Sequence, residues 1–211
     1  MRTMIPMAIF LVLTIVVCGA EAQNLTLADD ATFTAVSGYA GANKTLGATG
    51  GFRGLTAIEW WEDSDEPCKI RLDSVHVNTG DVNQPELALT GVQPRLGSQP
   101  CSSPGNRKRV GFAGTANWIH KVQVCTTDKK DSSGDKLKGI RIWAATVNSR
   151  SPLSISYGST AQEDKHTNCE TWRSAVACPS GKIGSRLRVH HDGAETEVMG
   201  LALECRTLKL E

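Results

Sequence analysis

The side chains best suited to chemistry in this chain are aromatic and basic. An indole offers an apolar face with a polar edge, which suits stacking on a sugar ring. Trp61 and Trp143 each follow a residue expected to face inward, so we expect both rings to face outward as candidate glycan-binding residues, with core packing as the competing role. The structural role is expected for Trp118 and Trp172. The chain has five tryptophans, the fifth being Trp60.

One tight basic cluster, Arg107-Lys108-Arg109, follows Pro104-Gly105 and is expected in a loop. Solvation is the simpler role for such a cluster, and contact with a polyanion such as a sulfated glycan is the alternative. These three residues therefore join the candidate glycan-binding set. The formal net charge of +1 favours no partner by itself. Because no basic stripe is interleaved with aromatic residues, we expect no nucleic-acid partner.

Catalytic and metal-binding patterns are not recognisable in the sequence. The chain has five histidines, but neither a G-x-S-x-G elbow nor an H-E-x-x-H helix motif. The stretch 190–193, His-His-Asp-Gly, is typical of a strand leading into a turn. The acidic run 62–66 offers oxygen ligands for calcium but lacks a closing ligand pattern, so a solvated loop is favoured. We therefore predict a protein that is not an enzyme and that needs no metal or cofactor.

The N-terminal residues predict secretion. Arg2 precedes an apolar run from Ile5 to Val17, and Ala20-Glu21-Ala22 follows with the small-residue spacing of a cleavage site. We expect a signal peptide over residues 1–22, cleaved before Gln23, with a retained anchor as the alternative. No later stretch approaches the roughly 20 apolar residues that cross a bilayer. The mature product is expected to be extracellular and without a membrane anchor.

Cysteines and glycosylation sequons agree with that compartment. Six cysteines remain after the signal peptide, and an even number predicts three disulfides with 15 possible connectivities. Strand order favours the local pairs Cys68–Cys101, Cys125–Cys169 and Cys178–Cys205. No C-x-x-C pair indicates zinc. Two N-x-T sequons, at Asn24 and Asn43, are candidate glycosylation sites, and Asn43 lies farther from the expected N-terminus.

The elements that must position these residues are β-strands. Three stretches place glycine ahead of an alternating apolar strand, at Gly54, Gly139 and Gly200, and glycine there suits a bulge or a close backbone approach. The last two follow another strand-like run across a polar loop, so a hairpin is expected to repeat. Residues 23–211 are expected to form one all-β domain, with a loop-rich seam at 93–106.

Alternation along these strands predicts which residues enter the core. Inward-facing positions are expected at Ile70, Leu72, Val122, Val124, Ile140, Ile142, Ile183, Ser185, Leu187, Val189, Leu201, Leu203 and Cys205. Ala202 and Glu204 are expected on the opposite face of their strand. Arg71, Gln123 and Arg141 are expected in water.

The last third of the chain resembles one repeat of the vitelline membrane outer layer protein family. The residues that carry the resemblance are Trp172, Cys178-Pro179-Ser180-Gly181, the strand ending Leu187-Arg188-Val189 and the closing strand Met199 to Cys205. The middle unit keeps Trp118, Cys125 and Lys138-Gly139-Ile140. The first unit is looser, since no closing cysteine strand follows Trp60-Trp61 and Cys68. The glycine-rich stretch 47–51 is similar to the related jacalin-like prisms.

The resemblance implies a β-prism of three sheets, with a β-sandwich as the alternative fold. It also implies an extracellular coat or barrier protein with weak glycan binding and no established cofactor. The sugar site of jacalin-like prisms uses a free N-terminal glycine or a G-x-x-x-D loop near the end, and we identify neither in this sequence. Two functions remain open: a secreted lectin-like or defence module that binds an extracellular glycan, and a structural component of a coat, mucus or matrix that binds other proteins.

Overall fold

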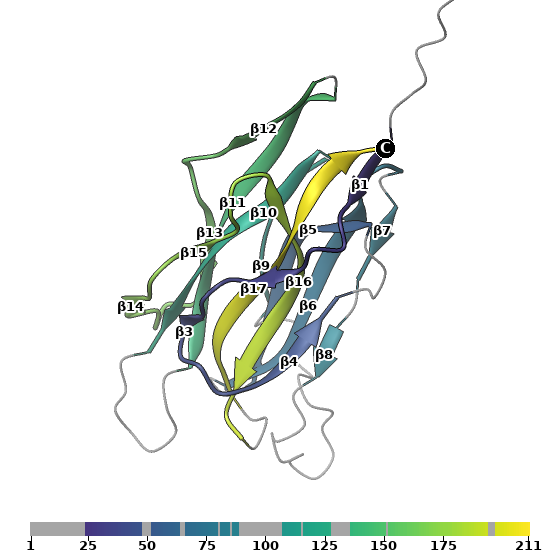
Figure 1. Ribbon diagram of the computed structural model, residues 1–211. Helices are drawn as coiled ribbons and strands as arrows, with labels where there is room; N and C mark the ends of the chain where they lie inside the picture. Colours follow the sequence, from purple (N-terminus) through teal and green to yellow (C-terminus); the bar gives the residue numbers. More distant parts are fainter. Residues whose placement is uncertain are drawn as a thin grey trace, which may run out of the picture.

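The computed structural model describes residues 24–47, 52–63, 66–79, 81–84, 86–88, 107–114, 116–127, 136–150, 152–193 and 197–211. Throughout these ranges the regular elements are β-strands (Figure 1). No helix in these ranges is long and apolar enough to cross a membrane. The expected signal peptide at 1–22, the seam at 93–106 and Cys101 lie outside the described residues.

Three long antiparallel hairpins organise the fold. The first pairs β5 (Arg53–Asp63) with β6 (Glu66–His76), the second pairs β10 (Asn117–Thr126) with β11 (Leu137–Arg150), and the third pairs β16 (Lys182–His191) with β17 (Val198–Leu210). Gly54 thus belongs to the opening strand of its hairpin, whereas Gly139 and Gly200 belong to closing strands. Grouping the three glycines as equivalent was wrong, because local patterns do not show which strand follows.

Short strands widen each hairpin into a sheet, which we number as the hairpin it contains. The first sheet adds β7 (Val82–Asn83), β8 (Glu86–Ala88) and β9 (Arg107–Gly111). The second adds β12 (Leu153–Tyr157), β13 (Gln162–Lys165), β14 (Thr171–Trp172) and β15 (Val176–Ala177). The third adds β1 (Leu25–Leu27), β2 (Thr32–Phe33), β3 (Ser37–Gly38) and β4 (Ala42–Leu46). The first described residues therefore complete the sheet of the last hairpin.

The three sheets enclose one hydrophobic core. The opening strands β5, β10 and β16 contact one another, and apolar residues from all three hairpins form a single buried cluster that includes Ile58, Val122 and Leu203. Three sheets that share one core form a β-prism. The prediction of an all-β prism is confirmed, and the first hairpin does complete the three-sheet arrangement.

Each opening strand carries a β-bulge near its start. The extra, unpaired residues are Thr56, His120 and Ser185. Because a bulge shifts the alternation, residues before it face the other side of the sheet from residues after it. The prediction that Ile183 and Ser185 share the face of Leu187 and Val189 was therefore wrong. Ile183 packs in a second, smaller cluster with Trp118 and Leu25, and the Ser185 hydroxyl donates to Glu204 on the outer face.

Each closing strand also carries a bulge, whose extra residue is Cys68, Lys138 or Met199. Regular pairing with the opening strand resumes at the next residue. In the last two hairpins this next residue is glycine, Gly139 and Gly200. A Cβ on Gly139 would lie 2.8 Å from the Lys165 side chain, and one on Gly200 would lie 2.5 Å from the backbone oxygen of Tyr39. The predicted bulge is confirmed next to both glycines, and the close backbone approach is confirmed at Gly200.

Two of the three expected disulfides lie within the described residues. Cys125–Cys169 and Cys178–Cys205 have Cα atoms 5.6 and 5.5 Å apart, which confirms these pairings. The first ties the end of β10 to the segment before β14, and the second ties the segment before β16 to β17. Closing loops of this size stabilises a fold by about 3 kcal/mol for each bridge. The expected partner of Cys68, Cys101, lies outside the described ranges.

Polar residues expected in water are only half exposed. Arg71 pairs with Glu59, with Nη2 and Oε2 2.5 Å apart. Gln123 donates to the backbone oxygen of Arg173 at 2.6 Å, and the guanidinium of Arg141 lies 3.8 Å from the centroid of the Trp172 ring. Ala202 and Glu204 face outward as expected but are buried. The outer faces of the sheets are therefore layered with packed polar side chains.

The acidic run 62–66, at the turn between β5 and β6, is also less exposed to solvent than we expected. Glu62 is buried, and its Oε1 accepts a hydrogen bond of 3.0 Å from Nζ of Lys138, which is fully buried. The second oxygen lies 3.5 Å from Nδ1 of His166. The interpretation of this run as a solvated loop is wrong at Glu62, because the carboxylate joins the first hairpin to the second.

A methyl group at Gly200 should destabilise the prism. Gly200→Ala would bring Cβ against three atoms of the crossing segment 36–39, two of which belong to the backbone. Backbone cannot rotate away as a side chain does, so we expect a loss of about 1–3 kcal/mol in the free energy of unfolding, measured by urea denaturation. Gly158→Ala is the control, since its Cβ would meet its nearest atom at 3.5 Å. Equal losses in the two variants would contradict the close approach.

Stability should also depend on pH through His120. Burial lowers the pKa of His120 below its ordinary value, with the charge of Lys121 acting in the same direction. The unfolded chain then binds a proton that the folded chain refuses, so stability is held above about pH 6.5 and falls as pH drops below it. His120→Phe should make this fall shallower, as followed by thermal unfolding between about pH 7.5 and 5. His76→Phe, at a half-exposed site, is the control; an unchanged slope in His120→Phe would overturn this cause.

Candidate functional site

The candidate residues Trp61, Arg107 and Arg109 lie together on the outer face of the first sheet. Trp61 pairs directly with Arg107 of β9, and Glu59 pairs with Arg109 two residues away. The basic cluster thus forms a strand, which corrects its expected place in a loop. Strand alternation sends Lys108 to the opposite face, where its Nζ lies 3.4 Å from Asp164 Oδ1 of β13. The three basic residues therefore do not act as one patch.

The charges on this face are largely neutralised. Arg109 lies 3.2 Å from Glu59 through Nε and 2.9 Å from Asp73 through Nη2. The Trp61 ring is half-buried, with Nζ of Lys69 4.9 Å and Cζ of Arg71 5.6 Å from its centroid. A sugar could stack on this ring only after a cation moved aside. The face offers an aromatic platform, but a covered one.

Trp143 lies on a different surface, the outer face of the second sheet. Its indole nitrogen donates to the backbone oxygen of Ser159 at 3.1 Å, and Nζ of Lys121 lies 4.2 Å from the ring centroid. Trp172, expected in the core, is half-buried on the same outer face, where its ring lies over Gly139. Trp118 is buried as expected. Trp61 and Trp143 therefore both face outward as predicted, but they lie on different sheets and do not form one site.

Another aromatic side chain stands out at the end of the prism where the hairpins turn. The segment 37–42, which we call the arch, crosses the third sheet next to Gly200. The Ser37 hydroxyl accepts a hydrogen bond from the backbone of Val124 at 2.9 Å, and the Tyr39 backbone donates to Met199 at 3.1 Å. The Tyr39 side chain remains 43% exposed, with the guanidinium of Arg173 4.8 Å from its ring.

His190 supports the other side of the arch. Its Nδ1 lies 3.3 Å from both the backbone nitrogen and the backbone oxygen of Gly41. Burial lowers the pKa of His190, with the charges of Arg188 and His191 acting the same way against the bond to Gly41. The neutral ring is thereby favoured, and its Nδ1 can accept from the Gly41 N–H. The arch is held on both sides, so its shape is fixed before any ligand arrives.

The turn between β16 and β17 lies beside the arch. Asp192 Oδ1 accepts a hydrogen bond of 3.0 Å from the backbone of Glu197, and the Asp192 backbone donates to Glu197 at 3.1 Å. The Glu197 carboxylate lies 3.0 Å from Nζ of Lys136. Residues 194–196 fall outside the described ranges. These contacts close the base of the turn, where Asp192 is half-buried.

Sequence reasoning missed this location. The turn begins with Gly193, and Glu197 follows four residues later. The clue was the position of this glycine directly ahead of the closing strand. Tyr39 had no comparable signal, because only the crossing of the arch over β17 brings it to the turn. Among the described residues, no group of three histidine, cysteine or acidic side chains is placed to hold a metal ion.

Both candidate glycosylation sites are exposed. Asn43 lies in β4, and its neighbours Ala42 and Lys44 are exposed as well. Asn24 lies beside β1, where its Oδ1 accepts a hydrogen bond of 2.9 Å from Asn78. Access is therefore open at both sequons, and their modification stays a prediction.

The fold is shared with solved lectin structures. No family model and no curated protein sequence matches the chain. The structure of the Calystegia sepium agglutinin superposes with a TM-score of 0.51 at 11% identity, covering 83% of this chain and 96% of that one. Calsepa lectin in complex with a biantennary N-glycan gives 0.52 at 12%, with the same coverage. Single-chain recombinant jacalin gives 0.50 at 6%, covering 85% and 96%. These similarities show a jacalin-like β-prism, while the likeness to the vitelline membrane outer layer family stays a prediction.

Proposed function

We propose that this protein is a secreted, non-enzymatic, lectin-like protein that binds carbohydrate where the arch meets the turn between β16 and β17. The observation that carries the proposal is the exposed Tyr39 on an arch that is fixed to the sheet next to the turn between β16 and β17. The fold supports it, because a protein with the same prism was solved with an N-glycan bound.

The chemistry of this site suits a sugar. The Tyr39 ring offers an apolar face for the C–H side of a pyranose, and its hydroxyl offers a polar edge. A carboxylate such as that of Asp192 accepts hydrogen bonds from adjacent sugar hydroxyls. The arch and the base of the turn are already hydrogen-bonded to the sheet, so binding loses little conformational entropy. A shallow, preformed site of this kind favours one or two terminal sugar units.

Trp61, Trp143, Arg107 and Arg109 remain a second location in the proposal. Trp61 and Trp143 face outward with a cation beside each ring, an arrangement that suits an acidic glycan better than a neutral one. Because these rings are less exposed than Tyr39, we rank this location below the arch as a candidate site.

Secretion belongs to the same proposal. The two described disulfides form and persist in oxidising compartments, and the expected signal peptide at residues 1–22 would direct the chain there. Glycosylation at Asn43 or Asn24 would follow from that route.

A glycan array tests the proposal directly. We expect the secreted protein to bind one class of glycan saturably, and Tyr39→Ala to weaken that binding about tenfold, roughly 1.4 kcal/mol, through loss of the stacking surface. Asp192→Asn should weaken it similarly, because it removes a charged acceptor. Affinities would be measured by isothermal titration with the best glycan found on the array.

Trp61→Ala and Trp143→Ala are the matched controls, since each removes an aromatic ring from another surface. Loss of binding in either of these with full binding in Tyr39→Ala would move the site to a sheet face. A blank array contradicts the lectin-like function. If the native protein also needed reductant for extraction from an insoluble layer, the structural coat or matrix role would take its place.

A further inference from the structure

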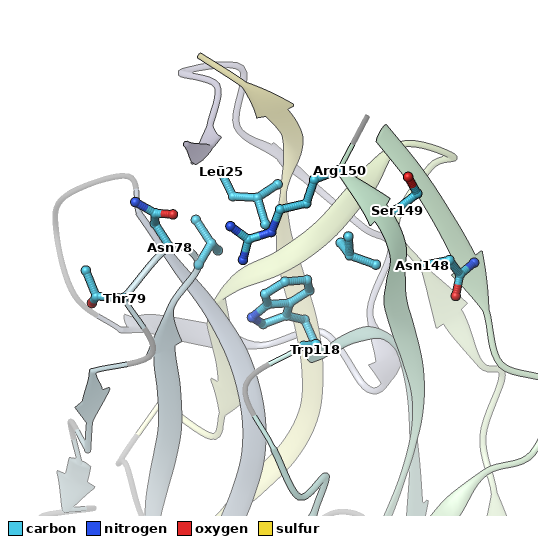
Figure 2. A pocket seen from close by; sticks show the side chains of 10 residues that line it. Leu25, Asn78, Thr79, Trp118, Asn148, Ser149 and Arg150 are labelled. Carbon is cyan, nitrogen blue, oxygen red and sulfur yellow. The ribbon is translucent and has the colours of Figure 1, made fainter. Parts of the chain in front are cut away.

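A pocket opens at the end of the prism opposite the hairpin turns. It has a volume of about 280 Å³ and lies between β1, the segment after β6, the start of β10 and the end of β11 (Figure 2). The strands β10 and β11 run from this end to the turn end, so the pocket is separate from the arch. Its lining residues are Leu25, Val77, Asn78, Thr79, Ala116, Trp118, Val147, Asn148, Ser149 and Arg150.

The floor of the pocket is rigid. Trp118 is only 1% exposed and belongs to the smaller apolar cluster. A Cβ on Gly54 would lie 2.2 Å from Cδ1 of its indole, so the ring is wedged against the backbone of β5. Val77, Leu25 and Val147 add apolar walls around it. A ligand would therefore meet a preformed apolar surface at the bottom of the pocket.

The rim is polar and carries a single charge. Among the described residues that line the pocket, Arg150 is the one charged residue, and none of them carries a carboxylate. Figure 2 shows its guanidinium directed into the pocket above Trp118. None of the ion pairs between described residues involves Arg150, which contrasts with the neutralised Arg109 and Arg71. The charge is thus available to an anion, and a planar guanidinium binds a carboxylate through two parallel hydrogen bonds.

One amide at the rim adds specificity. Asn78 uses its amide nitrogen to bond Asn24, which leaves its oxygen toward the pocket rim as an acceptor. Asn148 is directed away from the pocket, and its oxygen accepts a hydrogen bond from the exposed Ser156 of β12 (Figure 2). A donor at Arg150 and an acceptor at Asn78 suit a molecule that carries both a carboxylate and a hydroxyl group. The pocket volume lies just below the range of about 300–1,000 Å³ that is usual for small-molecule sites, so it suits one ring.

We propose that this pocket binds a single sugar residue that carries a carboxylate, such as a terminal hexuronic or sialic acid. The carboxylate pairs with Arg150, a hydroxyl bonds to Asn78, and the C–H face of the ring packs against the apolar walls. This site is independent of the arch and adds a second glycan contact at the other end of the molecule.

The test is a ¹⁵N NMR titration of the secreted protein with sodium glucuronate, sodium N-acetylneuraminate, glucose and sodium sulfate at equal ionic strength. We expect saturable shifts confined to the pocket residues and the Trp118 indole signal with at least one acidic sugar, at dissociation constants of about 1 mM. Glucose and sulfate should bind at least tenfold more weakly, because each lacks either the charge or the ring. Which of the two acidic sugars binds distinguishes uronic from sialic acid.

Variants separate this pocket from the arch. Arg150→Met should weaken the acidic sugar at least tenfold, and Arg150→Lys should fall between it and the parent because lysine cannot form the paired hydrogen bonds. Lys165→Met removes an exposed cation from β13, where no glycan contact is proposed, and it should leave the affinity unchanged, as should Tyr39→Ala. Equal binding of glucose or sulfate, unchanged affinity in Arg150→Met, or shifts that map elsewhere would each overturn the proposal. If glycan binding failed at the arch but the acidic sugar still bound at the pocket, the pocket proposal would be supported.

Discussion

The constraint on which the rest of this structure depends is the close approach of three bulged strands around one core. β5, β10 and β16 contact one another directly, and they approach so closely that two positions tolerate no side chain. Gly54 lies against the Trp118 ring, and a Cβ on Gly184 would lie 2.7 Å from the backbone oxygen of Ile119. The bulges at Thr56, His120 and Ser185 reverse the alternation of side chains in each strand. Residues on the two sides of a bulge can therefore pack into different apolar clusters on opposite faces of the sheet. The prism closes because these glycines and bulges let three sheets share a single core.

The same geometry explains why the three sheets present different surfaces. Lys69, Gly139 and Gly200 occupy equivalent positions after the closing bulge of each hairpin. Where the position is glycine, another segment crosses the outer face: Trp172 lies over Gly139, and the arch lies over Gly200. Where it is Lys69, the side chain itself lies over the ring of Trp61. One substitution at a repeated position thus decides whether a sheet face is covered. The arch, and with it the placement of Tyr39, is a consequence of glycine at position 200.

Sequence patterns predicted the parts of the fold that local chemistry determines. Alternation placed Val122, Val124, Ile140 and Ile142 in the core, and short separations suggested the two disulfides that the structure describes. Patterns could not predict the bulge at Ser185, because an extra residue shows only against the strand that pairs with it. For the same reason Arg107 to Arg109 appeared as a loop, since their strand forms only by pairing with β5. The candidate site depends on pairing between β3 and β17, for example of Gly38 with Gly200, and alternation within a strand carries no information about contacts between segments so far apart in the chain.

The arrangement of the strands also determines how the two ends of the molecule relate. β11 has 14 residues, and at about 3.3 Å per residue it extends roughly 45 Å from the turn end to the pocket. Coupling between distant sites needs an element with two alternative arrangements that both ligands bias. Between the arch and the pocket lie paired strands whose bulges, glycines and disulfides fix a single register. A one-residue slip of any of these strands would exchange its buried and exposed faces, so no low-energy alternative exists to transmit binding. Occupation of one end should therefore leave affinity at the other unchanged, and any gain from using both ends must come from a glycan surface that reaches both sites at once.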